Sequence, residues 1–180
     1  MSIDIILEGA NTTAELRAHV PQQHSAQVRV LDQADVAALQ QFWATLDRDG
    51  CCARFGHGIS RKTLASYGAG AVADTSLSFG AFHNGSLRGL LQAYPHNRDA
   101  AELALVVAPE ARGQGLGSSL LEHALRWAAD HGLAKVLLTF SRQNWRMRHL
   151  VSKANARLDL FLDDFLAEID VRAPPHIASQ

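Results

Sequence analysis

The first third of the chain shows one strand-like period followed by two helix-like periods. Residues 27–31 alternate polar and apolar side chains, which is typical of a half-buried strand. Asp32 is a favourable helix N-cap, and apolar side chains then recur at helical spacing at Val36, Leu39, Trp43 and Leu46. We expect the polar run Asp47-Arg48-Asp49-Gly50 to end this helix. A second helix is expected from Ser60, carrying Leu64 and Tyr67 and ending at Gly68.

The remainder of the chain predicts a sheet interrupted by two helices. Strand-like runs at 76–82, 87–94 and 101–107 form an antiparallel meander, with His83-Asn84-Gly85 as the first turn. A helix follows with an apolar stripe at Leu116, Leu120, Leu121, Ala124 and Ala128, and Gly132 ends it. The apolar strand 134–140 then lies parallel to strand 101–107. A helix over 143–153 leads into strands 157–161 and 165–171, joined by a hairpin across Asp163-Asp164.

Composition limits what such a domain can do. With 180 residues, 47 % hydrophobic and 19 % charged, the chain fits one domain over 27–171, preceded by an arm or extra edge strand at 1–26 and followed by a tail at 172–180. A formal net charge of -1 argues against a nucleic-acid partner, and the lack of a long apolar run argues against a membrane span.

The cysteines and histidines indicate the cellular location and whether a metal is bound. The two cysteines, Cys51 and Cys52, are adjacent, and no signal peptide is visible, which together indicate a reduced, cytoplasmic protein. The nine histidines have no zinc-site spacing, so we expect no metal.

The most informative segment is the glycine-rich run between strand 101–107 and the helix that follows. Glycines 113, 115 and 117 alternate in a tight turn where a helix begins, so several backbone N–H groups can converge on one anion, such as a diphosphate. The run lacks the G-x-x-x-x-G-K-S/T pattern of a P-loop. It also lacks the G-x-G-x-x-G of a dinucleotide fold and the acidic residue about 20 positions later.

The run matches Gln/Arg-x-x-Gly-x-Gly/Ala, as Arg112-Gly113-Gln114-Gly115-Leu116-Gly117. In this context it resembles the acetyl-CoA loop of the GNAT family of N-acetyltransferases. The order of elements over residues 27–171 also resembles that family. A second family motif, in the last helix, is matched by Asn144, Met147, Leu150 and Lys153. In Cys52-Ala53-Arg54-Phe55 and in Ala101-Glu102-Leu103-Ala104 the chain is similar to the catalytic domain of Pat-type bacterial protein lysine acetyltransferases.

The resemblance implies an α/β (α+β) GNAT fold. Its mixed central sheet has about seven strands with helices on both faces, and strands 101–107 and 134–140 splay apart in a V. Acetyl-CoA is the implied co-substrate, with its pantetheine arm along the backbone of Leu105, Val106 and Val107. The pyrophosphate is expected on backbone N–H groups from Gly113 to Ser118, through Gln114, Gly115, Leu116 and Gly117. Arg112 and Asn144 would add contacts, and a backbone N–H near Leu105 would polarise the thioester carbonyl.

The resemblance also suggests how the amine is activated. Glu102 matches a position that some family members use as the general base, and it is our candidate; a glutamate with only a structural role is the alternative. His83 and His96 are weaker candidates, and an acyl-enzyme on Cys51 or Cys52 is disfavoured because nothing in the sequence places a base beside either thiol.

Two departures from the family pattern leave alternatives open. Asn155 replaces a helix-ending glycine, which asparagine can do in the left-handed conformation. Val151 replaces a tyrosine that in many members protonates the leaving thiolate. We therefore predict an N-acetyltransferase, acting on a protein lysine or on a small amine, with a non-catalytic acyl-CoA sensor as the rival function. The resemblance also implies that two segments flank the amine: the loop with Arg54 and Phe55 between the first two helices, and the last hairpin with the acids Asp159, Asp163, Asp164 and Glu168. The sequence leaves a homodimer open.

Overall fold

The computed structural model describes residues 27–55, 60, 63–64 and 77–172. The predicted N-terminal arm, most of the second predicted helix and nearly all of the predicted tail lie outside this part of the chain. Where the second helix begins, Leu64 N–H donates to the Ser60 carbonyl at 3.0 Å, as expected for a first helical turn.

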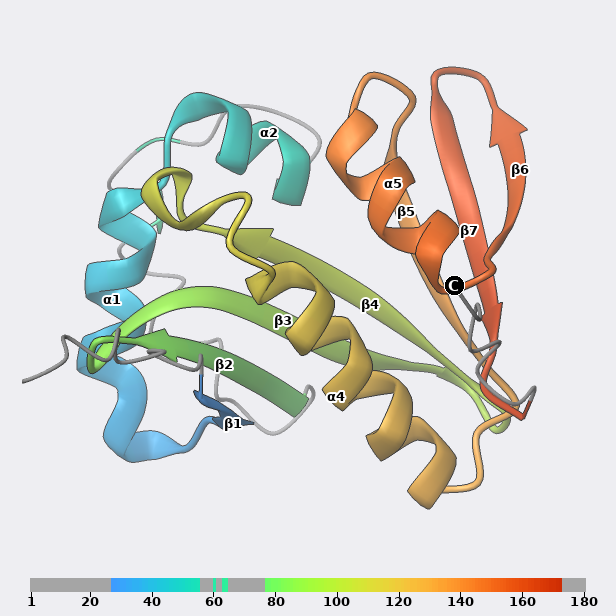
Figure 1. Ribbon diagram of the computed structural model, residues 1–180, viewed down its shortest axis with the longest axis horizontal. Helices are drawn as coiled ribbons and strands as arrows, with labels where there is room; N and C mark the ends of the chain where they lie inside the picture. The colour runs from blue at the N-terminus through green and yellow to red at the C-terminus, as the bar shows by residue number, and fades with distance from the viewer. Residues whose placement is uncertain (1–26, 56–59, 61–62, 65–76, 173–180) are drawn as a thin grey trace, which may run out of the picture.

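Strands and helices alternate much as the hydrophobic pattern predicts (Figure 1). The strands are β1 (Gln27–Val30), β2 (Leu77–His83), β3 (Ser86–Asn97), β4 (Ala100–Val107), β5 (Lys135–Ser141), β6 (Arg157–Phe161) and β7 (Asp164–Asp170). The α-helices are α1 (Val36–Thr45), α2 (Arg48–Phe55), α4 (Leu116–Asp130) and α5 (Trp145–Lys153), with 3-10 turns η1 (Gln33–Asp35) and η2 (Pro109–Ala111). No helix in these described ranges is long and apolar enough to cross a membrane.

The strands form one seven-stranded sheet in the order β1-β2-β3-β4-β5-β7-β6. Every pairing is antiparallel except β4 with β5, which is parallel, as the helical crossover through α4 requires. The sheet is therefore mixed and confirms the predicted fold class. Both terminal strands of the described sheet, β1 and β6, pair on one side only.

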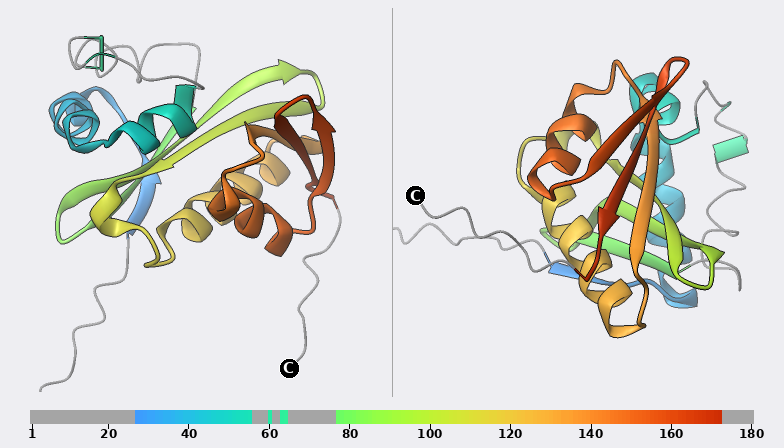
Figure 2. Two further views of the ribbon diagram at one scale, coloured as in Figure 1. Left: turned by 90° about the horizontal axis from the view of Figure 1, so that it is seen from above. Right: turned by 90° about the vertical axis from the view of Figure 1, so that its right-hand side faces the viewer.

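Helices cover both faces of the sheet (Figure 2). On one face, α1 and α2 enclose a core that includes Leu39, Phe42 and Trp43 with Leu90 of β3. On the other face, α4 and α5 cover the larger core. The predicted α4 stripe is confirmed, because all of its members are buried: Leu116, Leu120, Leu121, Ala124 and Ala128.

The expected splay is visible in the register of β4 against β5. These strands pair only at Ala100↔Lys135, Ala101↔Val136 and Glu102↔Leu137. Beyond that point β4 continues to pair with β3 and β5 continues to pair with β7. The sheet is thus open along the second half of β4, and Glu102 lies where the opening begins.

One helix was not predicted. Helix α1 ends at Thr45, close to where we expected the run Asp47-Arg48-Asp49-Gly50 to end it, but the same run also begins helix α2. Asp47 acts as the cap, because its Oδ1 accepts from Gly50 N–H at 2.7 Å and its carbonyl accepts from Cys51 N–H at 3.0 Å. Arg54 and Phe55 consequently lie at the end of a helix rather than in a loop.

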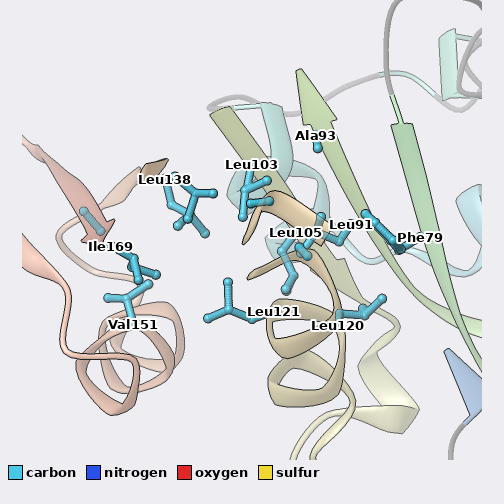
Figure 3. Close-up of a cluster of buried hydrophobic side chains, with 14 of the residues drawn as sticks. Phe79, Leu91, Ala93, Leu103, Leu105, Leu120, Leu121, Leu138, Val151 and Ile169 are labelled. Atoms are coloured by element: carbon cyan, nitrogen blue, oxygen red, sulfur yellow. The ribbon is translucent and has the colours of Figure 1, made fainter. Parts of the chain in front are cut away.

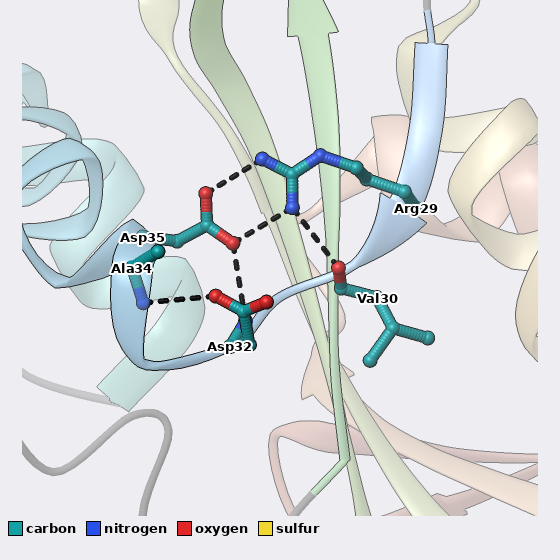
Figure 4. A network of polar contacts seen from close by, with 5 residues as sticks. All are labelled: Arg29, Val30, Asp32, Ala34 and Asp35. Atoms are coloured by element: carbon teal, nitrogen blue, oxygen red, sulfur yellow. Dashed lines mark hydrogen bonds and ion pairs between the residues drawn. The ribbon is translucent and has the colours of Figure 1, made fainter.

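A polar network fixes the entry from β1 into α1 (Figure 4). Arg29 on β1 donates to both carboxylate oxygens of Asp35, at 2.7 and 2.6 Å, and Asp32 and Asp35 form a reciprocal capping box. These hydrogen bonds, those from Arg29 above all, hold the pKa of Asp35 below its ordinary value. The predicted cap at Asp32 is confirmed.

Several predicted turns have the backbone conformation that their residues suggest. Asn84 and Gly85 have φ of 51° and 74° between β2 and β3, and Asn155 has φ of 55° after α5. The last hairpin differs slightly from expectation, because Asp164 already belongs to β7 and the turn lies at Leu162-Asp163.

Candidate active site

The opening between β4 and β5 exposes a short stretch of backbone. Ala108 N–H donates to the Arg88 carbonyl at 2.8 Å, next to the Gly89↔Val107 pair. Hydrogen-bonded and non-hydrogen-bonded pairs alternate along an antiparallel ladder, so Val106 bonds to β3, whereas Leu105 and Val107 direct their backbone groups away from it. Of the three residues expected to receive pantetheine, the register therefore leaves Leu105 and Val107 facing the opening.

The glycine loop adds a second set of backbone donors at the wide end of the opening. Gly113 and Gly115 have φ of 77° and 82°, and Gly115 is the N-cap of the 15-residue helix α4. The first helical bond is Ser119 N–H to the Gly115 carbonyl, at 3.0 Å, so the preceding N–H groups through Ser118 have no helical acceptor. No side chain caps this end. Backbone donors arranged in this way suit an anion such as a diphosphate, and the pyrophosphate site stays a prediction.

Other residues of the loop support it from within the protein. Leu116 is buried in the core and offers only its backbone, while Gln114 Nε2 donates to the Glu110 carbonyl at 3.1 Å. A Cβ on Gly117 would meet Leu150, Leu105 and Val107 at ordinary contact distances of 3.7–3.9 Å. Gly117 thus has no protein-internal need for glycine, which fits a motif position that accepts glycine or alanine.

Arg112, the first residue of the motif, is engaged inside the protein. Its Nη1 and Nη2 donate to the two carboxylate oxygens of Asp47 at 3.0 and 2.7 Å, and its Nε donates to the Val107 carbonyl at 3.3 Å. The hydrogen bonds from Arg112 hold the pKa of Asp47 below its ordinary value. Arg112 therefore connects the glycine loop to the start of α2.

Asn144 and Val151, on or beside α5, differ in what they can offer. Asn144 is the N-cap of α5, and its Oδ1 accepts from Met147 N–H at 3.1 Å. Val151 is fully buried and packs in the core near Leu121, Leu138 and Ile169 (Figure 3). A valine in that position supplies no proton to a thiolate.

Glu102, the candidate base, is exposed on β4 at the start of the splay. Its carboxylate has no hydrogen bond or ion pair with any other described residue, so it is free to accept a proton. In the ladder it lies opposite Tyr94 of β3, and both side chains extend from the α2 face of the sheet.

The sequence did not reveal a polar cluster beside Glu102. Arg54 Nη2 donates to Gln92 Oε1 at 2.6 Å and to the Tyr94 hydroxyl at 2.9 Å. Its guanidinium lies 5.0 Å from the Phe55 ring centroid. Gln92 is only 2 % exposed. Arg54 is 38 residues from Gln92 along the chain, and only an unusual glutamine inside a strand hinted at the contact.

The acids expected to attract the amine are largely neutralised. Asp159 pairs with Arg157 at 3.2 Å, Asp163 with Arg142 at 3.4 Å, and Glu168 with Lys135 at 2.7 Å. Arg146 and Arg148, from the basic run on α5, lie over the rings of Trp145 and Phe165. These contacts weaken the case for recognition of a cation by the β6–β7 hairpin.

The surroundings of Cys51 do not favour an acyl-enzyme, as expected. Cys51 is 4 % exposed, and burial, followed by the neighbouring Cys52 and Asp47, raises the pKa of its thiol. Within the described ranges, no group of three or more His, Cys, Asp or Glu side chains could hold a metal ion.

Several solved structures that share this fold are acetyltransferases. The GNAT domain of S. lividans PAT superposes with a TM-score of 0.70 at 19 % identity, covering 81 % of this chain and 90 % of that one. The ribosomal-protein-S18-alanine N-acetyltransferase from Escherichia coli gives 0.63 at 19 % identity, covering 86 % and 99 %. The spermidine N-acetyltransferase from Vibrio cholerae, in complex with CoA and spermine, gives 0.66 at 19 % identity, covering 81 % and 95 %. No curated protein matches the chain.

The family of the chain is shown by its sequence, because structures of such low identity show only a shared fold. The sequence model of the Acetyltransferase (GNAT) family matches residues 36–155, which include both helices of the α1–α2 face, the splayed strands, the glycine loop and α5. Because this match spans most of the fold and both predicted motifs, the chain belongs to the GNAT family of acyl-CoA-dependent N-acetyltransferases.

Proposed function

We propose that the protein transfers the acetyl group of acetyl-CoA to a primary amine by direct attack within a ternary complex. The observation that carries this proposal is the position of Glu102, an unpaired carboxylate at the point where β4 and β5 separate. The Leu105 carbonyl and the Val107 N–H would bind the pantetheine arm as an added strand does. The N–H groups at the start of α4 would hold the pyrophosphate.

In this mechanism Glu102 accepts a proton from the incoming ammonium, directly or through water. The free amine nitrogen attacks the thioester carbonyl carbon, and the Leu105 N–H stabilises the oxyanion that forms. When the carbon–sulfur bond breaks, the sulfur leaves as a thiolate. Because Val151 has no proton to give, solvent or the proton shed by the nitrogen restores the CoA thiol.

The rival function, an acyl-CoA sensor without turnover, is favoured by Val151 alone. Both rivals predict binding of acetyl-CoA, so binding does not separate them. By their names, one protein of this fold acetylates an alanine of a ribosomal protein and another acetylates spermidine. For this chain, a protein lysine and a small amine both remain candidate acceptors.

The test is release of CoA thiol from acetyl-CoA in the presence of a mixed panel of amines and lysine peptides. We expect acceptor-dependent release that falls about 100-fold or more in Glu102→Gln, since a general base contributes roughly 10²–10⁴ in rate. The variant should bind acetyl-CoA as wild type does. Binding without any acceptor-dependent release would instead identify a sensor.

A further inference from the structure

The polar cluster next to Glu102 contains a cation without a counter-charge. Among the described arginines, Arg29 and Arg112 are also held by two or more side-chain hydrogen bonds, and each pairs with an aspartate. Arg54, in contrast, donates hydrogen bonds only to the neutral partners Gln92 and Tyr94, and its guanidinium lies over the uncharged Phe55 ring. No described carboxylate forms an ion pair with it. A partly buried guanidinium loses hydration, and a neutral partner restores only part of that loss.

The guanidinium is also incompletely hydrogen-bonded. Its Nε is buried and has no partner, while Nη2 makes both recorded bonds. Gln92 is nearly inaccessible, so it fixes the position of Arg54 without being available to a ligand itself. Buried Gln92 therefore holds the Arg54 guanidinium in place, yet no described carboxylate pairs with its charge.

The location of Arg54 relates it to the acceptor rather than to acetyl-CoA. Tyr94, which accepts a hydrogen bond from Arg54, lies directly opposite Glu102 in the β3–β4 ladder. Arg54 comes from α2, which covers that face, whereas the glycine loop leads into α4 on the other face. A fixed cation and a free carboxylate thus flank Tyr94 on the same side of the sheet.

We propose that Arg54, held by Gln92 and Tyr94, is an anion subsite for the acceptor, which carries a carboxylate near the amine that is acetylated. This inference rests on the proposed function, because it takes Glu102 as the place where the amine reacts. The carboxylate belongs either to an amino acid or to an acidic side chain beside a protein lysine. Arginine is suited to such a ligand because its charge is permanent and its donors fit a carboxylate.

The experiment compares acceptors that differ only in the carboxylate. One arm pairs ω-amino acids of two to six carbons with the alkylamines of equal length. The other pairs lysine peptides that carry glutamate beside the lysine with peptides that carry glutamine there. We expect wild type to favour the carboxylate by about tenfold or more in kcat/KM in one arm, which also identifies the source.

Variants of Arg54 decide whether it is responsible. In Arg54→Gln the ratio between matched acceptors should fall close to one, and Arg54→Lys, which keeps the charge but loses the fork, should retain part of it. Arg48→Gln, at an exposed position of the same helix, is the matched control and should keep the wild-type ratio. An absent preference in wild type, or a ratio unchanged in Arg54→Gln, would overturn the proposal.

A binding measurement separates this proposal from the proposed function. Calorimetric titration of the matched acceptors into the protein with bound CoA needs no turnover. Binding that depends on both the carboxylate and Arg54, without acetyl transfer, would support the subsite and contradict catalysis. Acetyl transfer with equal binding of both acceptors would support catalysis and contradict the subsite.

Discussion

Gly113 and Gly115 are the residues of the glycine loop whose identity the backbone itself requires. Their positive φ angles lie in the left-handed region, where a Cβ on an L-residue approaches the following carbonyl. Neither glycine has any atom near the place of a Cβ, so crowding is not the reason for their presence. What they provide is the turn that directs N–H groups toward one point.

Gly115→Ala should therefore weaken acetyl-CoA binding and lower the free energy of unfolding by about 1–2 kcal/mol, the cost of a left-handed L-residue. Gly117→Ala is the matched change two residues later. Its Cβ meets only ordinary contacts and lies within α4, so stability should be unchanged or slightly higher. Urea unfolding and calorimetry with CoA measure both quantities; equal losses in the two variants would contradict this account.

At this scale the sequence identified residues whose role depends on their neighbours in the chain. The caps at Asp32 and Asn155, the Asn84-Gly85 turn and the α4 stripe were predicted because each is a local pattern. Arg112 was predicted as a ligand of the pyrophosphate, yet its carboxylate partner, Asp47, is 65 residues away. Contacts of that separation depend on packing and leave no local signal.

Among the elements, α2 is the one that the sequence did not predict. A run of Asp, Arg, Asp and Gly is usually a helix end, and α1 does end just before it, but here Asp47 also caps a new helix through Gly50 N–H. Because of α2, Arg54 reaches β3 and the capping residue Asp47 reaches Arg112. This helix and its cap thus contact both the sheet face that carries Glu102 and the glycine loop.

The Asp47–Arg112 pair should consequently affect cofactor binding even though Asp47 lies outside the loop. In Asp47→Asn, Arg112 loses a charged partner and the loop loses its connection to α2, so the Kd for CoA should rise about three- to tenfold. Asp49→Asn makes the same charge change at an exposed site of α2 and is the control.

The direction of that change tests two roles of Arg112. If Arg112 acts only as a brace, removal of Asp47 weakens CoA binding. If Arg112 is a direct ligand that Asp47 restrains, the freed guanidinium would reach the pyrophosphate and CoA would bind more tightly. An unchanged Kd in Asp47→Asn would show that the brace does not contribute to the cofactor site.

At the scale of the whole molecule, the hydrophobic pattern was enough to predict the architecture, because separate helices cover each face of the sheet. Strand order and the parallel β4–β5 pair follow from the crossover through α4, and the family resemblance supplied the splay. The pattern could not indicate which ion pairs join separate elements, such as Arg29 of β1 with Asp35 of η1 and Arg112 with Asp47.

These pairs should make the fold sensitive to acid. The hydrogen bonds from Arg29 and Arg112 lower the pKa of Asp35 and Asp47, so each carboxylate stabilises the native state above its unfolded pKa of about 3.9. That contribution is lost as the pH falls through the lower, native pKa. Over the same range carboxylates become neutral, and the 17 Lys and Arg residues and nine His residues leave the chain strongly positive.

Asp35 is the better probe because it is only 7 % exposed and also belongs to the capping box. Asp35→Asn should lower the free energy of unfolding at pH 7 by about 1 kcal/mol, a modest value because the Arg29 side chain is 41 % exposed. The difference from wild type should shrink as the pH falls through the native pKa of Asp35, because protonation removes the charge that Arg29 pairs with. Urea unfolding across the acidic range measures it, with exposed Asp99→Asn as control. A deficit in Asp35→Asn that does not shrink on acidification would show that Asp35 stabilises the fold through packing or its cap rather than through its charge.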